Sequence, residues 1–251
     1  MFSLEIECDP DERDLLIAEL WEHGSAGIAE LSTRRVRAFF EDTADRDALQ
    51  ELYPGAGLRI EEERDWVQFA RDQLQPMEVG ARFFLAPAWR DDPAPPGRFR
   101  IAVNPGLAFG TGVHETTRLC MEALEEFVKP GTSVLDVGTG SGILAQAAKL
   151  LGASSVHACD TDPVAIRIAG GGFVGSVDAV GAQSADLVVA NINPETIIRI
   201  APDLLRALRR PGGVLLVSGF EADEVELVQA ALPPAREVRH KGNWALMVIG
   251  Q

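Results

Sequence analysis

The sequence SVLDVGTGSGIL, residues 133–144, joins an apolar run to a glycine-rich turn that opens a helical pattern. Its glycines, Gly138, Gly140 and Gly142, permit a tight turn and let a ligand approach the backbone. Around this stretch, apolar strand patterns alternate with helical patterns from residue 112 onward. Such alternation predicts a parallel α/β sheet with crossover helices, in a domain that we place at residues 98–251.

An acidic residue beside the turn favours one kind of nucleotide cofactor. The turn alone leaves the choice open, because Gly140, Gly142 and Ala145 also fit the GxGxxA fingerprint of dinucleotide binding. Asp136 lies two positions before the first glycine and places a carboxylate next to the ligand. A carboxylate attracts the sulfonium and ammonium groups of S-adenosylmethionine and repels the pyrophosphate of a dinucleotide. We therefore interpret the turn as a binding site for S-adenosylmethionine.

Two further polar residues follow apolar strand patterns, at the edge where such sheets bind ligands. Asp160 ends the next strand, 22 residues after Gly138, where its carboxylate can accept hydrogen bonds from ribose hydroxyls. Alternatively it only shapes the turn CDTDP, the role we assign to Asp162. Asn191 ends the next apolar run, and its amide can hold an incoming amine and aim the nitrogen lone pair at a methyl group. The alternative for Asn191 is a strand-end residue that satisfies a loop.

A glycine-containing loop, NPGLAFGTGVHETT at residues 104–117, leads into an amphipathic helix. Thr116 and Thr117 lie in the first turn of that helix, where amides and hydroxyls suit an anion such as the methionine carboxylate of the cofactor. Simple capping of the helix by threonine is the alternative. His114 is interpreted as a loop residue that orders its neighbours, with a role as a base as the alternative.

Cysteine spacing and hydropathy exclude two classes of protein. Cys8, Cys120 and Cys159 lie far apart and lack both the CxxC spacing and the nearby histidines of a zinc site, so we expect free thiols and no metal. No run of eighteen apolar residues is present, and the first residues are acidic, unlike a signal peptide. We therefore expect a cytoplasmic protein without a membrane contact.

The first 63 residues form a separate pattern, in which strand-like and helix-like segments follow the order βαββαβ. This is the split βαβ arrangement of a small ferredoxin-like α+β domain. The segment holds 17 Asp and Glu against 6 Arg, so it attracts basic partners and repels phosphate backbones and anionic lipid. Solubility alone is the alternative reason for this charge. Residues 64–97 are interpreted as a connector with a short helix at 66–76 and a hairpin around the Pro-rich turn DDPAPPG.

These motifs together resemble the bacterial ribosomal protein L11 methyltransferase (PrmA) family over nearly the whole chain. The resemblance rests on DWVQFARDQLQP, PGLAFGTGVHETTRLC, VLDVGTGSGIL, DTDPVAI, ADLVVANI and NWALMVIG. It implies a ferredoxin-like domain that captures the ribosomal protein, a linker, and a class I, Rossmann-like methyltransferase domain. It also implies that S-adenosylmethionine contacts Thr117, Gly138, Asp160 and Asn191.

The reaction that the resemblance implies is methyl transfer to lysine and/or N-terminal α-amino groups of a basic ribosomal protein. Asn191 is the expected catalytic residue, in an in-line displacement that needs no metal and no essential general base. We further expect a monomer that does not bind nucleic acid directly.

The chain departs from the family pattern between Asp160 and Asn191, which only 30 residues separate. The glycines at 170–172 shorten the expected helix, and the strand of the adenine pocket is reduced to about FVGS. Ser176 or Asp178 is expected to replace the missing contact. Three alternatives follow: a methyltransferase for another protein or a small molecule, a binding module with a decayed pocket, and, last, an NAD-dependent dehydrogenase. A dehydrogenase is placed last because no catalytic Tyr and Lys pair is evident in the sequence.

Overall fold

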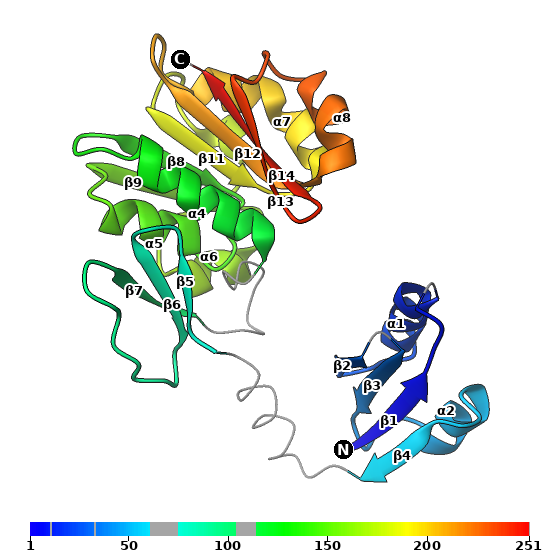
Figure 1. The fold of residues 1–251 in the computed structure, drawn as a ribbon. Helices are drawn as coiled ribbons and strands as arrows, with labels where there is room; N and C mark the ends of the chain where they lie inside the picture. Colours follow the sequence, from blue (N-terminus) through cyan, green and yellow to red (C-terminus); the bar gives the residue numbers. More distant parts are fainter. Residues whose placement is uncertain (11, 33, 61–74, 104–113, 251) are drawn as a thin grey trace. The chain divides into compact units, whose positions relative to one another are not determined.

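The computed structural model describes residues 1–10, 12–32, 34–60, 75–103 and 114–250, and the chain divides into two compact units. The first unit is Met1–Leu74 and the second is Gln75–Gln251 (Figure 1). Each unit has its own hydrophobic core among the described residues. The expected linking helix at 66–76 lies outside the described residues except for its last two positions.

The first unit contains the predicted βαββαβ order. Its elements are β1 Phe2–Glu7, α1 Arg13–Glu22, β2 Gly27–Ser32, β3 Arg35–Phe40, α2 Arg46–Leu52 and β4 Gly57–Ile60. The strands form one antiparallel sheet in the order β2-β3-β1-β4. Alternate residues of β1, namely Phe2, Leu4 and Ile6, are buried in the core of the unit, as the period of two in a half-buried strand requires.

A three-stranded sheet opens the second unit, and here the predicted hairpin is wrong. Its strands are β5 Met77–Val79, β6 Phe83–Pro87 and β7 Phe99–Val103, in the order β5-β6-β7. β6 and β7 are parallel, with Phe83 opposite Phe99. The Pro-rich segment therefore carries the chain back to the edge of the sheet where β6 begins, so that β7 runs in the same direction as β6. Arg100 fixes this return, because its guanidinium donates hydrogen bonds to the carbonyls of Asp92 and Arg90.

The main sheet of the second unit has seven strands in the order β10-β9-β8-β11-β12-β14-β13. β14 is antiparallel to its neighbours β12 and β13, and the other pairs are parallel. In chain order the elements are α4 Glu115–Phe127, β8 Ser133–Val137, α5 Ile143–Leu150, β9 Ser155–Asp160, α6 Pro163–Ala169, β10 Phe173–Val174, η1 Val177–Ala179, β11 Leu187–Asn191, α7 Pro194–Ala207, β12 Val214–Glu221, η2 Ala222–Glu224, α8 Val225–Gln229, β13 Glu237–Lys241 and β14 Trp244–Gly250. The parallel α/β sheet predicted from the sequence is thus present.

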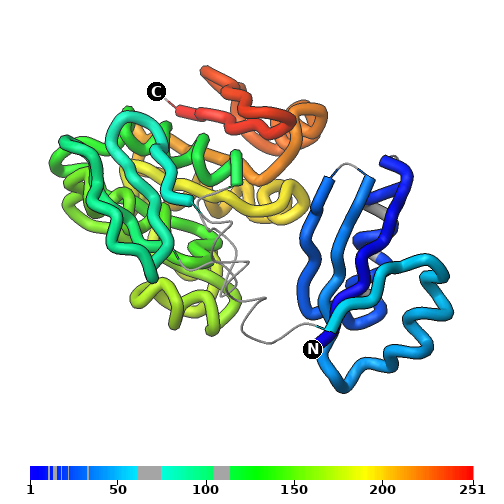
Figure 2. Tube along the Cα trace, turned by 60° about the horizontal axis from the view of Figure 1, so that its bottom comes forward, coloured from blue at the N-terminus to red at the C-terminus, as the bar shows by residue number. Residues whose placement is uncertain are grey.

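Helices cover both faces of this sheet, and each face has its own core. Val134 of β8 belongs to the core with α4 and α5, whereas its neighbour Leu135 belongs to the core with α7. The last two strands lie side by side, red in Figure 1 and orange to red in Figure 2. Because β8, β9 and β11 are parallel, their carboxyl ends meet at one edge. Among the described residues, every helix is too short or too polar to cross a membrane.

Candidate functional site

The glycine turn between β8 and α5 requires glycine on two counts. Gly138, Gly140 and Gly142 have φ angles of 71°, 53° and 80°, in the left-handed region that favours glycine. A Cβ on Gly138 would lie 2.3 Å from Cγ2 of Ile192, and one on Gly142 would lie 2.8 Å from Cβ of Ala169. The turn is therefore sharp, as its sequence predicted, and it is also closely packed.

Asp136 lies beneath this turn and holds its two ends together. The side chain is fully buried. Its Oδ2 accepts hydrogen bonds from the hydroxyl of Thr139 at 2.6 Å and from the backbone N–H of Ala145 at 3.1 Å. Among the described residues, Oδ1 has no hydrogen-bond partner. Burial raises the pKa of this carboxyl to about 6, although both hydrogen bonds act in the opposite direction. Asp136 is thus an organiser of the turn with one oxygen unpaired.

The raised pKa of Asp136 predicts a pH dependence of folding stability. Between about pH 4 and pH 6 the unfolded chain loses the proton of this carboxyl while the folded chain keeps it. The unfolded state then binds fewer protons, so the contribution of Asp136 to the free energy of unfolding falls as the pH rises through this window. Asp136→Asn removes the contribution. The free energy of unfolding of the wild type minus that of this variant, from urea titrations, should decrease from pH 4 to pH 7. Parallel pH profiles would contradict the buried carboxyl.

Asp160 connects the end of β9 to the same turn. Its Oδ2 accepts a hydrogen bond from the N–H of Gly140 at 2.9 Å, and its Oδ1 accepts one from the N–H of Asp162 at 3.0 Å. Asp162 in turn caps α6, with its Oδ1 2.7 Å from the N–H of Val164, which confirms its interpretation as a turn residue. Each Asp160 oxygen keeps a second lone pair, so the carboxylate can still accept hydrogen bonds from a ligand.

Thr117 and Asn191 meet at the carboxyl edge of the sheet although 74 positions separate them in the sequence. The site bounded by Thr117, Gly138, Asp160 and Asn191 at this edge is called the crevice below. The Asn191 side-chain N–H donates to the Thr117 hydroxyl at 3.3 Å. Thr117 is buried in the first turn of α4, and among the described residues the buried Asn191 Oδ1 has no partner. This orientation leaves the acceptor end of the Asn191 amide free to bind a donor.

Sequence reasoning missed the residues that hold the segment after Asn191. The N–H of Ile192 donates to the carbonyl of Ser218 at 3.1 Å, and the Ser218 hydroxyl donates to the carbonyl of Ala245 at 2.7 Å. The pairing of β12 with β14 shifts between Ser218 and Phe220, and Gly219 lies in this bulge with a φ of 102°. A glycine inside an apolar strand pattern was the available signal for such a bulge.

The shortened segment after Asp160 keeps its end nearest the crevice. α6 ends at Ala169, and Gly170 adopts the left-handed conformation of a helix end. β10 has only two residues, yet Val174 pairs with Asp160, and the N–H of Gly175 donates to the carbonyl of Asp160 at 2.8 Å. Ser176 and Asp178 follow directly and are therefore delivered next to the carboxyl end of β9.

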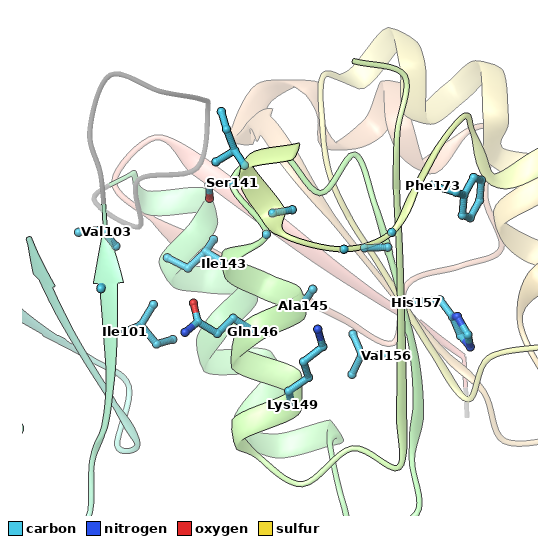
Figure 3. Close-up of a pocket in the computed structure, with 17 residues that line it drawn as sticks. Ile101, Val103, Ser141, Ile143, Ala145, Gln146, Lys149, Val156, His157 and Phe173 are labelled. Atoms are coloured by element: carbon cyan, nitrogen blue, oxygen red, sulfur yellow. The ribbon is translucent and has the colours of Figure 1, made fainter. Parts of the chain in front are cut away.

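A cavity of about 750 Å³ lies beside the amino-terminal part of β9 (Figure 3). Its lining comes from β7, the glycine turn, α5, β9, α6 and residues 171–173, and includes Gln146, Lys149, Val156 and Phe173. Thr117, Asp160 and Asn191 are not among the lining residues, whereas Ser141 and Gly142 are, so the cavity adjoins the glycine turn but does not include the Thr117–Asn191 pair. α5 packs against β9, and the seven-residue α6 contributes Ile168 and Ala169 to the lining.

The described residues contain no cluster of His, Cys, Asp and Glu that could hold a metal ion. Cys8, Cys120 and Cys159 are all unpaired thiols, and the last two are buried.

Comparisons with known proteins agree on one family. The family model described as ribosomal protein L11 methyltransferase (PrmA) matches residues 35–251. A protein of that name from Symbiobacterium thermophilum is 45% identical over 190 residues, covering 72% of this chain and 62% of the relative. Another from Pelobacter propionicus is 34% identical over 298 positions, covering 98% of this chain and 96% of the relative.

A solved structure supports the same assignment of the fold. The ribosomal protein L11 methylase of Lactobacillus delbrueckii subsp. bulgaricus superposes with a TM-score of 0.64 at 30% identity. The match covers 70% of this chain and 98% of that one. The predicted α/β fold class is thereby confirmed. The 298-position alignment to the Pelobacter propionicus relative exceeds the 251 residues of this chain, so at least 47 aligned positions are gaps here.

Proposed function

The chain belongs to the ribosomal protein L11 methyltransferase (PrmA) family, and from this premise we propose that it methylates amino groups of ribosomal protein L11 with S-adenosylmethionine as donor. The matched region, residues 35–251, includes every residue of the crevice. One observation carries the proposal for the site. Thr117 fixes the Asn191 amide so that Asn191 Oδ1, buried and unpaired among the described residues, can accept a hydrogen from the incoming amine.

The residues around the crevice fit the donor. The unpaired Oδ1 of buried Asp136 suits a nearby cationic ammonium or sulfonium group, and Gly138, whose Cβ would clash with Ile192, keeps the turn tight beside it. Asp160 would accept hydrogen bonds from ribose hydroxyls. The proposed contacts are Thr117, Asp136, Gly138, Gly140, Gly142, Asp160 and Asn191. Ser176 and Asp178 are proposed next to the adenine, because β10 keeps its pairing at the carboxyl end of β9.

The donor supplies a methyl group on a sulfonium, and an amine nitrogen attacks that carbon in line as the carbon–sulfur bond breaks and S-adenosylhomocysteine leaves. The amine must first be neutral, which requires about 4.6 kcal/mol for a lysine at pH 7 and about 1.4 kcal/mol for an α-amino group. Asn191 would hold the neutral amine with its lone pair toward the methyl carbon, and positioning supplies most of the rate gain. The mechanism requires no general base.

Recruitment of the substrate is proposed for the acidic residues 1–63, with 64–97 as connector and 98–251 as the methyltransferase domain. The charge of residues 1–63, 17 Asp and Glu against 6 Arg, supports capture of a basic ribosomal protein. The separate core of the first unit supports independent folding of this part. We further propose that the chain is a cytoplasmic monomer that acts on ribosomal protein L11 and does not contact nucleic acid directly.

If the first unit recruits the substrate and the second binds the cofactor, removal of the first unit should affect only the substrate. Residues 75–251 should bind S-adenosylmethionine like the full chain, because the crevice lies within this unit. They should methylate L11 with a kcat/KM that is about tenfold lower, because steering by the acidic unit is lost.

Labelled S-adenosylmethionine and a mixture of ribosomal proteins test this prediction, with mass spectrometry of the labelled product and calorimetry of cofactor binding. Equal labelling by the full and truncated chains would contradict recruitment. Label on another protein or on none would contradict the proposed substrate, and the absence of binding heat would favour a decayed pocket.

A further inference from the structure

We propose that His114 is a positioning residue for methyl transfer, which fixes the first turn of α4 so that Thr117 holds the Asn191 amide in its reactive orientation. The inference rests on the proposed function and adds a residue to it. His114 acts through its neighbours and does not itself accept the proton of the substrate.

His114 caps α4 through an imidazole nitrogen. Its backbone is extended, with φ −67° and ψ 141°, and the helix begins at the next residue. Nδ1 lies 2.8 Å from the Thr116 hydroxyl and accepts the backbone N–H of Thr116 at 3.4 Å. Both Thr116 groups donate to the same nitrogen, so Nδ1 carries no proton and the ring proton is on Nε2. Ser, Thr, Asp and Asn are the usual N-cap residues, so a cap alone does not require histidine.

The ring of His114 has a second contact, with Trp244 at the start of β14. The ring centroids are 4.4 Å apart and the planes meet at 69°, the edge-to-face geometry that aromatic pairs favour. Trp244 is itself held in two strand pairs, opposite Glu221 of β12 and Lys241 of β13. The imidazole therefore connects the first turn of α4 to a rigid part of the sheet.

Two ion pairs hold the remainder of α4 against β13. Lys241 pairs with Glu122, and Arg239 pairs with Glu126 at 2.6 Å. Both lie further along the helix than His114, away from the crevice. The His114–Trp244 contact thus adds an attachment at the end of α4 that carries Thr117, beside the core packing of Leu119 and Cys120.

A small movement of that end would act directly on the reaction. Thr117 follows Thr116 in the first turn, and its hydroxyl receives the only side-chain hydrogen bond that Asn191 makes within the described residues. If the turn loosens, the Asn191 amide can rotate and Oδ1 no longer faces the amine. The imidazole contacts both Thr116 and Trp244, and these contacts hold it in place, which argues against its movement toward the substrate as a base.

Three variants and a matched control test the proposal on the full-length chain. His114→Ala should lower kcat about tenfold, because misplacement of a positioning group acts on the chemical step, and should change the Kd of S-adenosylmethionine less than about twofold. His114→Asn should recover part of kcat, since its side-chain oxygen can cap the helix but cannot replace the ring contact with Trp244. Trp244→Leu, which keeps the cap and removes the ring contact, should give an intermediate kcat. Glu126→Gln, at the far end of α4, should leave kcat unchanged.

Asparagine is not a base at neutral pH, so rescue by His114→Asn separates positioning from base catalysis. The inference is overturned if His114→Asn is as slow as His114→Ala, or if all three variants match an active wild type. Calorimetry with S-adenosylmethionine and thermal melting show that each variant is folded and loaded. A wild type that binds the cofactor and methylates nothing would instead remove the proposed function.

Discussion

Asn191→Ala should lower kcat for methyl transfer by about a thousandfold and leave the Kd of S-adenosylmethionine within about threefold of the wild type. The alanine keeps the strand and removes only the amide whose Oδ1 is unpaired among the described residues. The amine would then enter without a fixed direction for its lone pair. Single-turnover kinetics with L11 measures the rate of the chemical step, and calorimetry measures cofactor binding.

Asn193→Ala is the matched control for this variant. Asn193 lies two residues further on and caps α7, where its Oδ1 accepts the N–H of Thr196 at 2.9 Å. Its removal should lower the free energy of unfolding by about 1 kcal/mol and leave the rate unchanged. If Asn191→Ala instead abolishes cofactor binding, the amide serves the donor and not the amine.

Gly219→Ala should lower the free energy of unfolding by about 3 kcal/mol, because its φ of 102° and its surroundings both exclude a side chain. The new Cβ would lie 2.2 Å from the carbonyl oxygen of Ile192 and 2.8 Å from the N and C atoms of that residue. These are backbone atoms, so no rotamer change relieves the clash. The segment after Asn191 must move, and kcat should fall together with stability.

Gly181→Ala provides the comparison, because its Cβ would meet nothing within 4 Å. This variant should unfold at the wild-type urea concentration. A Gly219→Ala variant with wild-type stability and rate would show that the bulge does not hold the site.

Local patterns predicted the parts of the crevice that depend on short stretches of sequence. The glycine turn, Asp160 and Asn191 could be placed because each ends a strand pattern, and parallel strands bring such ends together. The enclosure of Asp136 could not be predicted, because it depends on packing by residues distant in sequence. The Thr117–Asn191 hydrogen bond joins two elements across 74 positions, and no spacing rule encodes it.

The parallel pairing of β6 with β7 shows where such reasoning fails. A Pro-rich connection between two apolar strands is typical of a hairpin. Nothing in the sequence distinguishes it from a loop that joins two parallel strands. The direction is fixed by side chains that act on the loop, above all Arg100 and its hydrogen bonds to two carbonyls. The bulge at Gly219 is a similar case, because the need for glycine comes from the Ile192 backbone, which the fold brings next to it.

The two-residue β10 has a consequence for how this fold tolerates lost length. It pairs with Cys159 and Asp160 only, so beyond it Ser155–Ala158 form the outer margin of the sheet. β10 therefore has no residues opposite Ser155–Ala158, while its two residues at the ligand edge pair in register with β9. Deletions that enter a parallel sheet from this side can accumulate without displacing a residue of the crevice, whereas a deletion of the same size in β8 or β11 would shift Gly138 or Asn191 out of place.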